Sequence, residues 1–173
     1  MANIEIPRPQ RGFKDMTLQM ATGVYDIVLQ RTLNGIDLPF EHVASVFDLY
    51  CGNGTLTLGS ILAFPNAQIH AMDYHKVLVA DGLRHPRVTF HQGWVTETLA
   101  DKKLKPADIV IMSFASRHHG FTKENIGLLS SHTMGYLLTI GDNDAIENEP
   151  WFNDKFQVRA TETVYGSTVW SVK

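Results

Sequence analysis

The sequence is poor in cysteine, has no long apolar run and carries no large excess of charge of either sign. Cys51 is the only cysteine in 173 residues, which excludes an intramolecular disulfide and favours a reducing, cytoplasmic location. No segment approaches the roughly 20 apolar residues of a membrane-spanning helix, and residues 1–14 lack the apolar core of a signal peptide. The formal net charge of −3 gives no general attraction to nucleic acid or anionic membranes. We therefore expect a soluble protein.

The length and the 44% of hydrophobic residues suit one domain with an apolar core. We predict an N-terminal arm and helix over residues 1–43, followed by a globular domain over 44–173. Within the arm, residues 16–33 place apolar side chains on one helical face, and Asn34 and Gly35 supply a stop. This helix either packs on the domain or caps its active site.

Beyond residue 44, apolar segments of strand length alternate with helical segments. The expected strands are 45–49, 68–72, 87–91, 107–112, 136–140, 155–164 and 168–172. The expected helices are 55–64, 75–84, 95–104 and 122–133. This alternation predicts right-handed crossovers and a mostly parallel sheet covered by helices, whereas the short turn at 165–167 predicts a hairpin. The expected fold is three-layer, doubly wound α/β, with a seven-stranded, mostly parallel sheet and a C-terminal antiparallel β-hairpin.

A glycine turn follows the first predicted strand and leads into a helix. Gly52 and Gly54 allow close approach of a ligand at the carboxyl end of the strand, where open α/β sheets place their ligands. The Asp48 carboxylate would repel a phosphate group at this turn. It could instead bind an ammonium group of a ligand, and the alternative is that it caps the turn. Asp73 ends the second strand and can accept bonds from both ribose hydroxyls, or cap the next helix. Trp94, after the third strand, either covers a base or belongs to the core.

Residues 48–54, Asp-Leu-Tyr-Cys-Gly-Asn-Gly, resemble the first motif of the class I (Rossmann-like) S-adenosylmethionine-dependent methyltransferases. The sequence of this motif is especially similar to that of the RNA uridine-C5 methyltransferases. The resemblance runs from about residue 44 to the C-terminus and implies S-adenosylmethionine as the cofactor. Gly93 and Trp94 fall where many members carry an acidic residue that faces the adenine amino group. The cofactor-binding residues implied are Asp48, Tyr50, Cys51, Gly52, Gly54, Asp73, Tyr74, Gly93, Trp94 and Ser113.

The resemblance also limits the chemistry. The uridine enzymes need a nucleophilic cysteine elsewhere in the domain, and this chain has only Cys51, inside the turn. The Ser-Phe-Ala-Ser segment at 113–116 lacks the Asp/Asn-Pro-Pro-aromatic motif of enzymes that methylate exocyclic amines. His118 and His119 resemble the histidines in this loop of many small-molecule methyltransferases, which makes them candidate general bases, or else solvated loop residues. The eight histidines show no metal-type spacing, so no metal is expected.

The predicted function is therefore an S-adenosylmethionine-dependent methyltransferase that acts on a small molecule or a protein side chain. Acidic residues within 142–154 disfavour a polyanionic substrate. The sequence of the glycine turn nevertheless leaves an RNA methyltransferase as an alternative. A second alternative is a module that binds S-adenosylmethionine without catalysis. Gly52, Gly54 and Asp73 superficially fit the Rossmann fingerprint of a dinucleotide-dependent oxidoreductase. Asp48 and the terminal hairpin argue against this alternative. The sequence does not indicate the oligomeric state.

Overall fold

A computed structural model gives the architecture of the chain. It describes Leu33 and residues 36–52, 54–74, 85–101, 103–113, 121–141, 144–162 and 166–173. The helix predicted over 75–84 lies outside these residues, and so does the helix predicted over 16–33 except for Leu33. None of the helices in the described part of the chain has the length and apolarity needed to cross a membrane.

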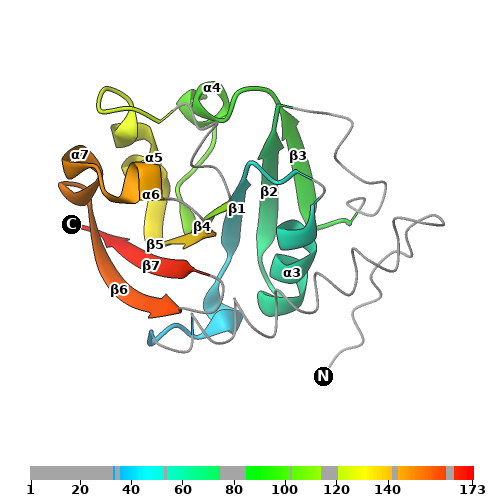
Figure 1. Cartoon of the computed structure of the whole chain (residues 1–173). Coiled ribbons are helices and arrows are strands. Elements are labelled where there is room, and N and C mark those ends of the chain that lie inside the picture. The colour runs from blue at the N-terminus through cyan, green and yellow to red at the C-terminus, as the bar shows by residue number, and fades with distance from the viewer. Residues whose placement is uncertain are drawn as a thin grey trace.

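In the described part of the chain, seven strands form one sheet in the order β3-β2-β1-β4-β5-β7-β6 (Figure 1). Their bounds are β1 Ser45–Leu49, β2 Gln68–Asp73, β3 Val88–Gln92, β4 Ala107–Ser113, β5 Thr133–Ile140, β6 Phe156–Glu162 and β7 Ser167–Val172. The strands from β1 to β5 pair in parallel, and β7 is antiparallel to both β5 and β6. The predicted α/β fold with a terminal antiparallel hairpin is confirmed.

The helical elements in the described residues are η2 Phe40–His42, α3 Thr55–Ala63, α4 Val95–Ala100, α5 Ile126–His132, α6 Asp144–Glu147 and α7 Pro150–Asn153. Two predicted helix bounds differ from the observed ones by four residues. The helix expected over 95–104 ends at Ala100, because the Asp101 carboxylate accepts the Lys103 N–H at 3.1 Å and turns the chain. The helix expected from Thr122 begins four residues later, after Asn125, whose backbone is not helical and whose Oδ1 accepts the Thr122 N–H at 2.6 Å.

The segment after β5 was expected to be an acidic loop, but it contains the short helices α6 and α7. Pro150 occupies the first turn of α7, after Glu149 at the N-cap position. Proline is common at this place because its missing N–H would be unpaired there anyway. Pro150 was therefore a usable signal that the sequence interpretation missed.

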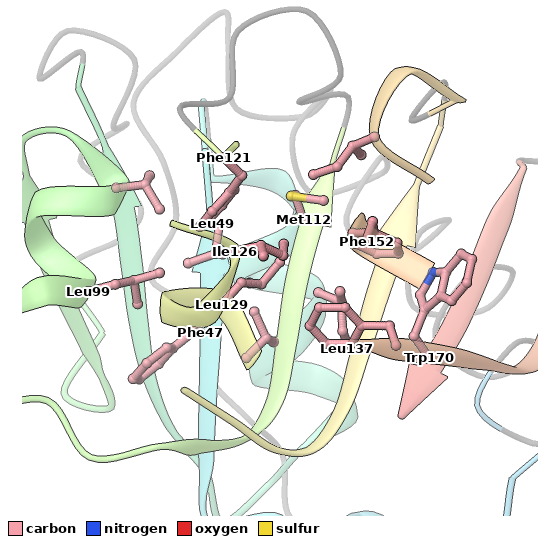
Figure 2. Packing of buried hydrophobic residues seen from close by; sticks show 14 of the residues in the cluster. Phe47, Leu49, Leu99, Met112, Phe121, Ile126, Leu129, Leu137, Phe152 and Trp170 are labelled. Atoms are coloured by element: carbon pink, nitrogen blue, oxygen red, sulfur yellow. The ribbon is translucent and has the colours of Figure 1, made fainter. Parts of the chain in front are cut away.

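Alternation along the strands divides the core between the two faces of the sheet. Val46 lies in a cluster with Leu58 and Ile61 of α3. Phe47 and Leu49 lie in a second cluster on the opposite face, together with side chains of α4, α5, α6 and α7 (Figure 2). Fully burying a side chain of this size contributes roughly 1.5–3 kcal/mol. The sheet is thus covered on both sides, as a largely parallel sheet requires.

The strand order creates a switch point between β1 and β4. From β1 the chain proceeds to β2 and β3 on one side, and β4 and β5 lie on the other. Open α/β sheets bind ligands at the carboxyl ends of the strands beside such a point. The glycine turn after β1 occupies this position, so the fold presents it to a ligand.

Candidate functional site

The turn after β1 is built from left-handed backbone. Tyr50 has a φ of +60°, Gly52 of +52° and Gly54 of +80°. The Gly54 N–H donates to the Cys51 carbonyl at 2.7 Å, and the Gly54 carbonyl accepts the Leu58 N–H at 2.9 Å. Gly54 thus closes the turn and begins α3, in a conformation that glycine adopts at little cost.

Two hydrogen bonds tie the turn to the carboxyl end of β2. The Cys51 N–H donates to the Met72 carbonyl at 3.0 Å, and the Gly52 N–H donates to the Asp73 carboxylate at 2.9 Å. Asp73 is itself only 7% exposed. The structure therefore brings the turn and the predicted ribose-binding carboxylate together. The Asp73 carboxylate also stabilises the turn through its hydrogen bond with the Gly52 N–H.

Asp48 is the penultimate residue of β1 and is fully buried. The hydroxyl of Thr57, in the first turn of α3, donates a hydrogen bond to its Oδ2. Oδ1 is buried as well and has no hydrogen-bond partner among the residues that the structure describes. Burial raises the pKa of the Asp48 carboxyl to about 7, hydrogen bonds from Thr57 lower it in part, and the nearby charge of Asp73 raises it further.

Two carboxyl groups beside the turn disfavour bound phosphate, because the local charge has the wrong sign. The pairing of Asp48 with Asp73 therefore suits a cationic group better than a pyrophosphate. Burial also raises the pKa of the Cys51 thiol, with the charges of Asp48 and Asp73 adding to the effect. A thiol that stays protonated is a poor nucleophile, which agrees with the exclusion of cysteine chemistry.

Exposed aromatic side chains lie beside the turn, at the ends of β2 and β3. Tyr74 and Trp94 are each 52% exposed, and their ring centroids are 4.7 Å apart at an interplanar angle of 35°. The Gly93 N–H donates to the Asp73 carbonyl at 3.0 Å, which joins the two strand ends. A hollow of about 510 Å³ lies next to Trp94, with Glu97 of α4 in its wall, a volume in the usual range of small-molecule sites.

A pair of histidines that the sequence interpretation missed lies farther from the turn. His70 Nδ1 and His91 Nε2 are 2.8 Å apart, and the rings stack at a centroid distance of 5.1 Å. Burial lowers the pKa of both imidazoles. The pairing of β2 with β3 could have indicated their proximity, but register is not readable from one sequence. In the described segments, no three His, Cys, Asp or Glu side chains form a group that could hold a metal ion.

The remaining predicted site residues are placed only in part. Ser113 is the last residue of β4 and pairs with Ile140 of β5, so its backbone lies at the carboxyl edge of the sheet. The candidate bases His118 and His119 lie outside the described residues. The structure therefore arranges the predicted cofactor site around β1, β2 and β3, and the role of the histidines stays a prediction.

Comparisons with known proteins agree with this geometry. No protein-family model matches the sequence, and no curated protein is significantly similar to it. Many solved structures share the fold. A precorrin-6y C5,15-methyltransferase from Geobacter metallireducens GS-15 has a TM-score of 0.60 and 17% identity over 83% of this chain and 86% of its own.

Larger methyltransferases match as well. An O-methyltransferase family protein from Burkholderia thailandensis has a TM-score of 0.56 and 16% identity, over 91% of this chain. The human N-acetylserotonin methyltransferase, solved in complex with S-adenosylmethionine, has a TM-score of 0.55 and 16% identity, over 90% of this chain. The match spans 56% and 55% of the length of these two proteins. The chain therefore has the fold of the class I S-adenosylmethionine-dependent methyltransferases.

Proposed function

We propose that the chain is an S-adenosylmethionine-dependent methyltransferase acting on a small molecule or a protein side chain. The observation that carries the proposal is the pair of buried carboxyl groups, Asp48 and Asp73, on the two sides of the glycine turn. In this fold the carboxyl ends of β1 and β2 form the ligand-binding edge. A ligand with an ammonium group at one end and a ribose at the other matches this arrangement, whereas a dinucleotide pyrophosphate does not.

Each part of the site has a role in holding the cofactor. Asp48 accepts from the ammonium group, and the backbone of Gly52 and Gly54 lets the ligand approach closely. The Asp73 carboxylate would accept hydrogen bonds from the ribose hydroxyls and retain its hydrogen bond from the Gly52 N–H. The exposed rings of Tyr74 and Trp94 would provide a surface for the adenine.

The aromatic pair sets a geometric condition on adenine binding. Two rings that sandwich a base lie about 7 Å apart, since each stacked gap is about 3.5 Å. The Tyr74 and Trp94 centroids are only 4.7 Å apart. The base would therefore stack on the outer face of one ring, unless the two rings moved apart to admit it.

When bound, S-adenosylmethionine supplies an electrophilic methyl group on a positively charged sulfur. The protein contributes alignment of the acceptor with that methyl group and removal of one proton. The proposed bases His118 and His119 follow β4 in the sequence. Glu149 and Asp154, which flank α7 after β5, add negative charge there, and this favours an acceptor that is not a polyanion.

The test is methyl transfer from labelled S-adenosylmethionine to three pools: small metabolites, proteins and RNA. We expect label in the small-molecule or protein pool, and we expect the matched variant Asp73→Asn to transfer much less at low cofactor concentration. Label in RNA would support an RNA methyltransferase instead. Cofactor binding without transfer to any pool would favour a binding module, and absence of binding would overturn the proposal.

A further inference from the structure

The Asp48 carboxyl is fully enclosed within the protein. It has no solvent exposure, and Oδ1 is buried without a hydrogen-bond partner among the described residues. A buried polar atom without a partner costs stability unless a ligand satisfies it. The orphaned oxygen lies beside the turn that forms the proposed cofactor site, two residues before Tyr50, where the left-handed backbone begins.

Thr57 determines how this carboxyl is held. Its hydroxyl donates to Asp48 Oδ2, and its side chain is fully buried. Because the hydroxyl is buried and engaged with Asp48, we infer that its action on a ligand is indirect. By engaging Oδ2, Thr57 leaves Oδ1 as the oxygen that remains for a cationic group.

The groups that face Asp48 make its ionisation depend on its surroundings. On the β2 side, Asp73 is a second carboxyl whose charge opposes ionisation of Asp48. In the turn, the Cys51 thiol has a raised pKa and stays neutral. The register partners of Asp48, Ala71 on β2 and Ile111 on β4, carry no charge. Among the described residues, these neighbours thus provide no cation that would hold Asp48 ionised without a ligand.

We propose that Thr57 is a positioning residue for Asp48, and that binding of the cofactor ammonium releases one proton from the Asp48 carboxyl to solvent. This inference rests on the proposed cofactor. In the step, the O–H bond of the neutral carboxyl breaks, its proton leaves to water, and the carboxylate pairs with the ammonium, which keeps all its own protons. Cofactor affinity therefore increases as the pH rises through the titration of Asp48 in the free protein.

The direct test is calorimetric titration of the whole chain with S-adenosylhomocysteine, from about pH 5.5 to about pH 7.5. This window lies below the usual pKa of an α-amino group, about 8, so the ligand stays protonated. Affinity should increase roughly 20-fold across the window. Two buffers of different ionisation enthalpy should show release of close to one proton near the lower limit. The control ligand 5′-methylthioadenosine lacks the ammonium group and should show neither effect.

A variant pair then tests the role of Thr57. Thr57→Val has a similar shape but no hydroxyl, so the ionised carboxyl loses a donor and the midpoint of the affinity profile should move to higher pH. At pH 6 the affinity should fall roughly tenfold. Thr57→Ser keeps the hydroxyl and should restore the wild-type midpoint. A merely structural role would weaken binding equally at every pH.

The outcomes separate this inference from the proposed function. Binding of S-adenosylhomocysteine with a flat pH profile and no proton release would leave the cofactor assignment standing and overturn the inference. Equal profiles for Thr57→Val and wild type would refute the positioning role of Thr57. Absence of binding in the wild type would overturn both. Should Thr57→Val fail to fold, the wild-type proton release still tests the ionisation of Asp48, and Thr57→Ala replaces Thr57→Val in the test of the positioning role.

Discussion

Asp108 and Asp48, at opposite ends of the parallel sheet, differ in their hydrogen bonding. At the amino-terminal end, Asp108 Oδ2 accepts the N–H groups of Ala44 at 2.7 Å and Ser45 at 3.0 Å. At the same end, the Arg87 guanidinium donates to three backbone carbonyls in and after α3. At the carboxyl end, Asp48 is fully buried, yet its Oδ1 has no partner in the described residues. Asp108 thus holds elements together, as Asp73 does at the other end, whereas Asp48 leaves a buried acceptor without a partner among the described residues.

The difference separates stability from binding. A carboxylate that accepts several backbone N–H groups stabilises the fold. A buried carboxyl with an orphaned oxygen costs stability, and such costs are concentrated at functional sites. Substitutions at the two ends should therefore have opposite signatures in unfolding and in ligand binding.

The largest expected effect concerns the unfolding of Asp48→Asn as a function of pH. The pKa of Asp48 in the folded protein is about 7, above its ordinary value of 3.8, so the native state binds more protons between these values. Wild-type stability should therefore decrease, relative to Asp48→Asn, as the pH rises from about 4 to about 7. The difference should be on the order of 4 kcal/mol, measured by urea unfolding at several pH values. If the unfolding free energies of the two proteins changed with pH in parallel, the pKa of Asp48 would not be raised in the folded protein.

The next largest effect is expected at the amino-terminal end, for Gly135→Ala. A Cβ atom at Gly135 would collide with the backbone carbonyl of Asp108, beside the register shift between β4 and β5. The variant should lose roughly 3 kcal/mol of unfolding free energy. The matched control is Gly127→Ala in α5, where an added Cβ would meet no atom within 4 Å, and a gain of about 0.5–1 kcal/mol is expected. Equal effects at the two glycines would refute the steric explanation.

Asp108→Ala should destabilise the protein without affecting the cofactor. The variant leaves two backbone N–H groups and the Ser45 hydroxyl without their shared acceptor, so a loss of about 2 kcal/mol is expected. Because the site lies at the other end of the sheet, the affinity for S-adenosylhomocysteine should not change. Urea unfolding and calorimetry on the same preparation measure both quantities. A weakened affinity in a folded Asp108→Ala protein would show that the two ends are not independent.

The smallest effect on stability is expected for Trp94→Ala. Trp94 is 52% exposed and contacts Tyr74, so its removal should change the unfolding free energy by no more than about 0.5 kcal/mol. Loss of the stacking surface should weaken cofactor binding by about 1 kcal/mol. The buried Trp170, whose Nε1 donates to Thr139 Oγ1 at 2.9 Å, gives the contrast: Trp170→Phe should destabilise the fold and leave affinity intact in the folded fraction. Unchanged affinity in Trp94→Ala would remove Trp94 from the site.

The sequence predicted the sheet well because its central strands, β1, β2 and β4, are largely buried. The segment from Ser45 to Leu49 matched β1 at both ends, and the terminal hairpin was correct because a short turn separates two strand-like runs. β5 was expected from Tyr136 but begins at Thr133. Gly135 interrupts the apolar pattern there, and only the close approach of Asp108 explains it. Local pattern cannot reveal such a contact between distant residues.

The candidate site was predictable in outline and less so in detail. Asp48, the glycine turn and Asp73 were recognisable because each follows or ends a predicted strand. The bond from Thr57 to Asp48 was missed, since it depends on the angle at which α3 leaves the turn. The tie between Asp73 and Gly52 was missed for a similar reason, because it depends on the pairing of β1 with β2.

The central claim is that the carboxyl end of the sheet binds S-adenosylmethionine through Asp48 and Asp73. It is tested most directly by calorimetric titration of wild type and Asp73→Asn with S-adenosylmethionine, S-adenosylhomocysteine and NAD. Asparagine still offers an oxygen to the Gly52 N–H, so the turn is preserved while the negative charge facing the ribose is lost. We expect the two sulfur ligands to bind, NAD not to bind, and the variant to lose roughly 1.5–3 kcal/mol of binding free energy. Binding of NAD alone, or equal affinity of wild type and variant for the sulfur ligands, would contradict the claim.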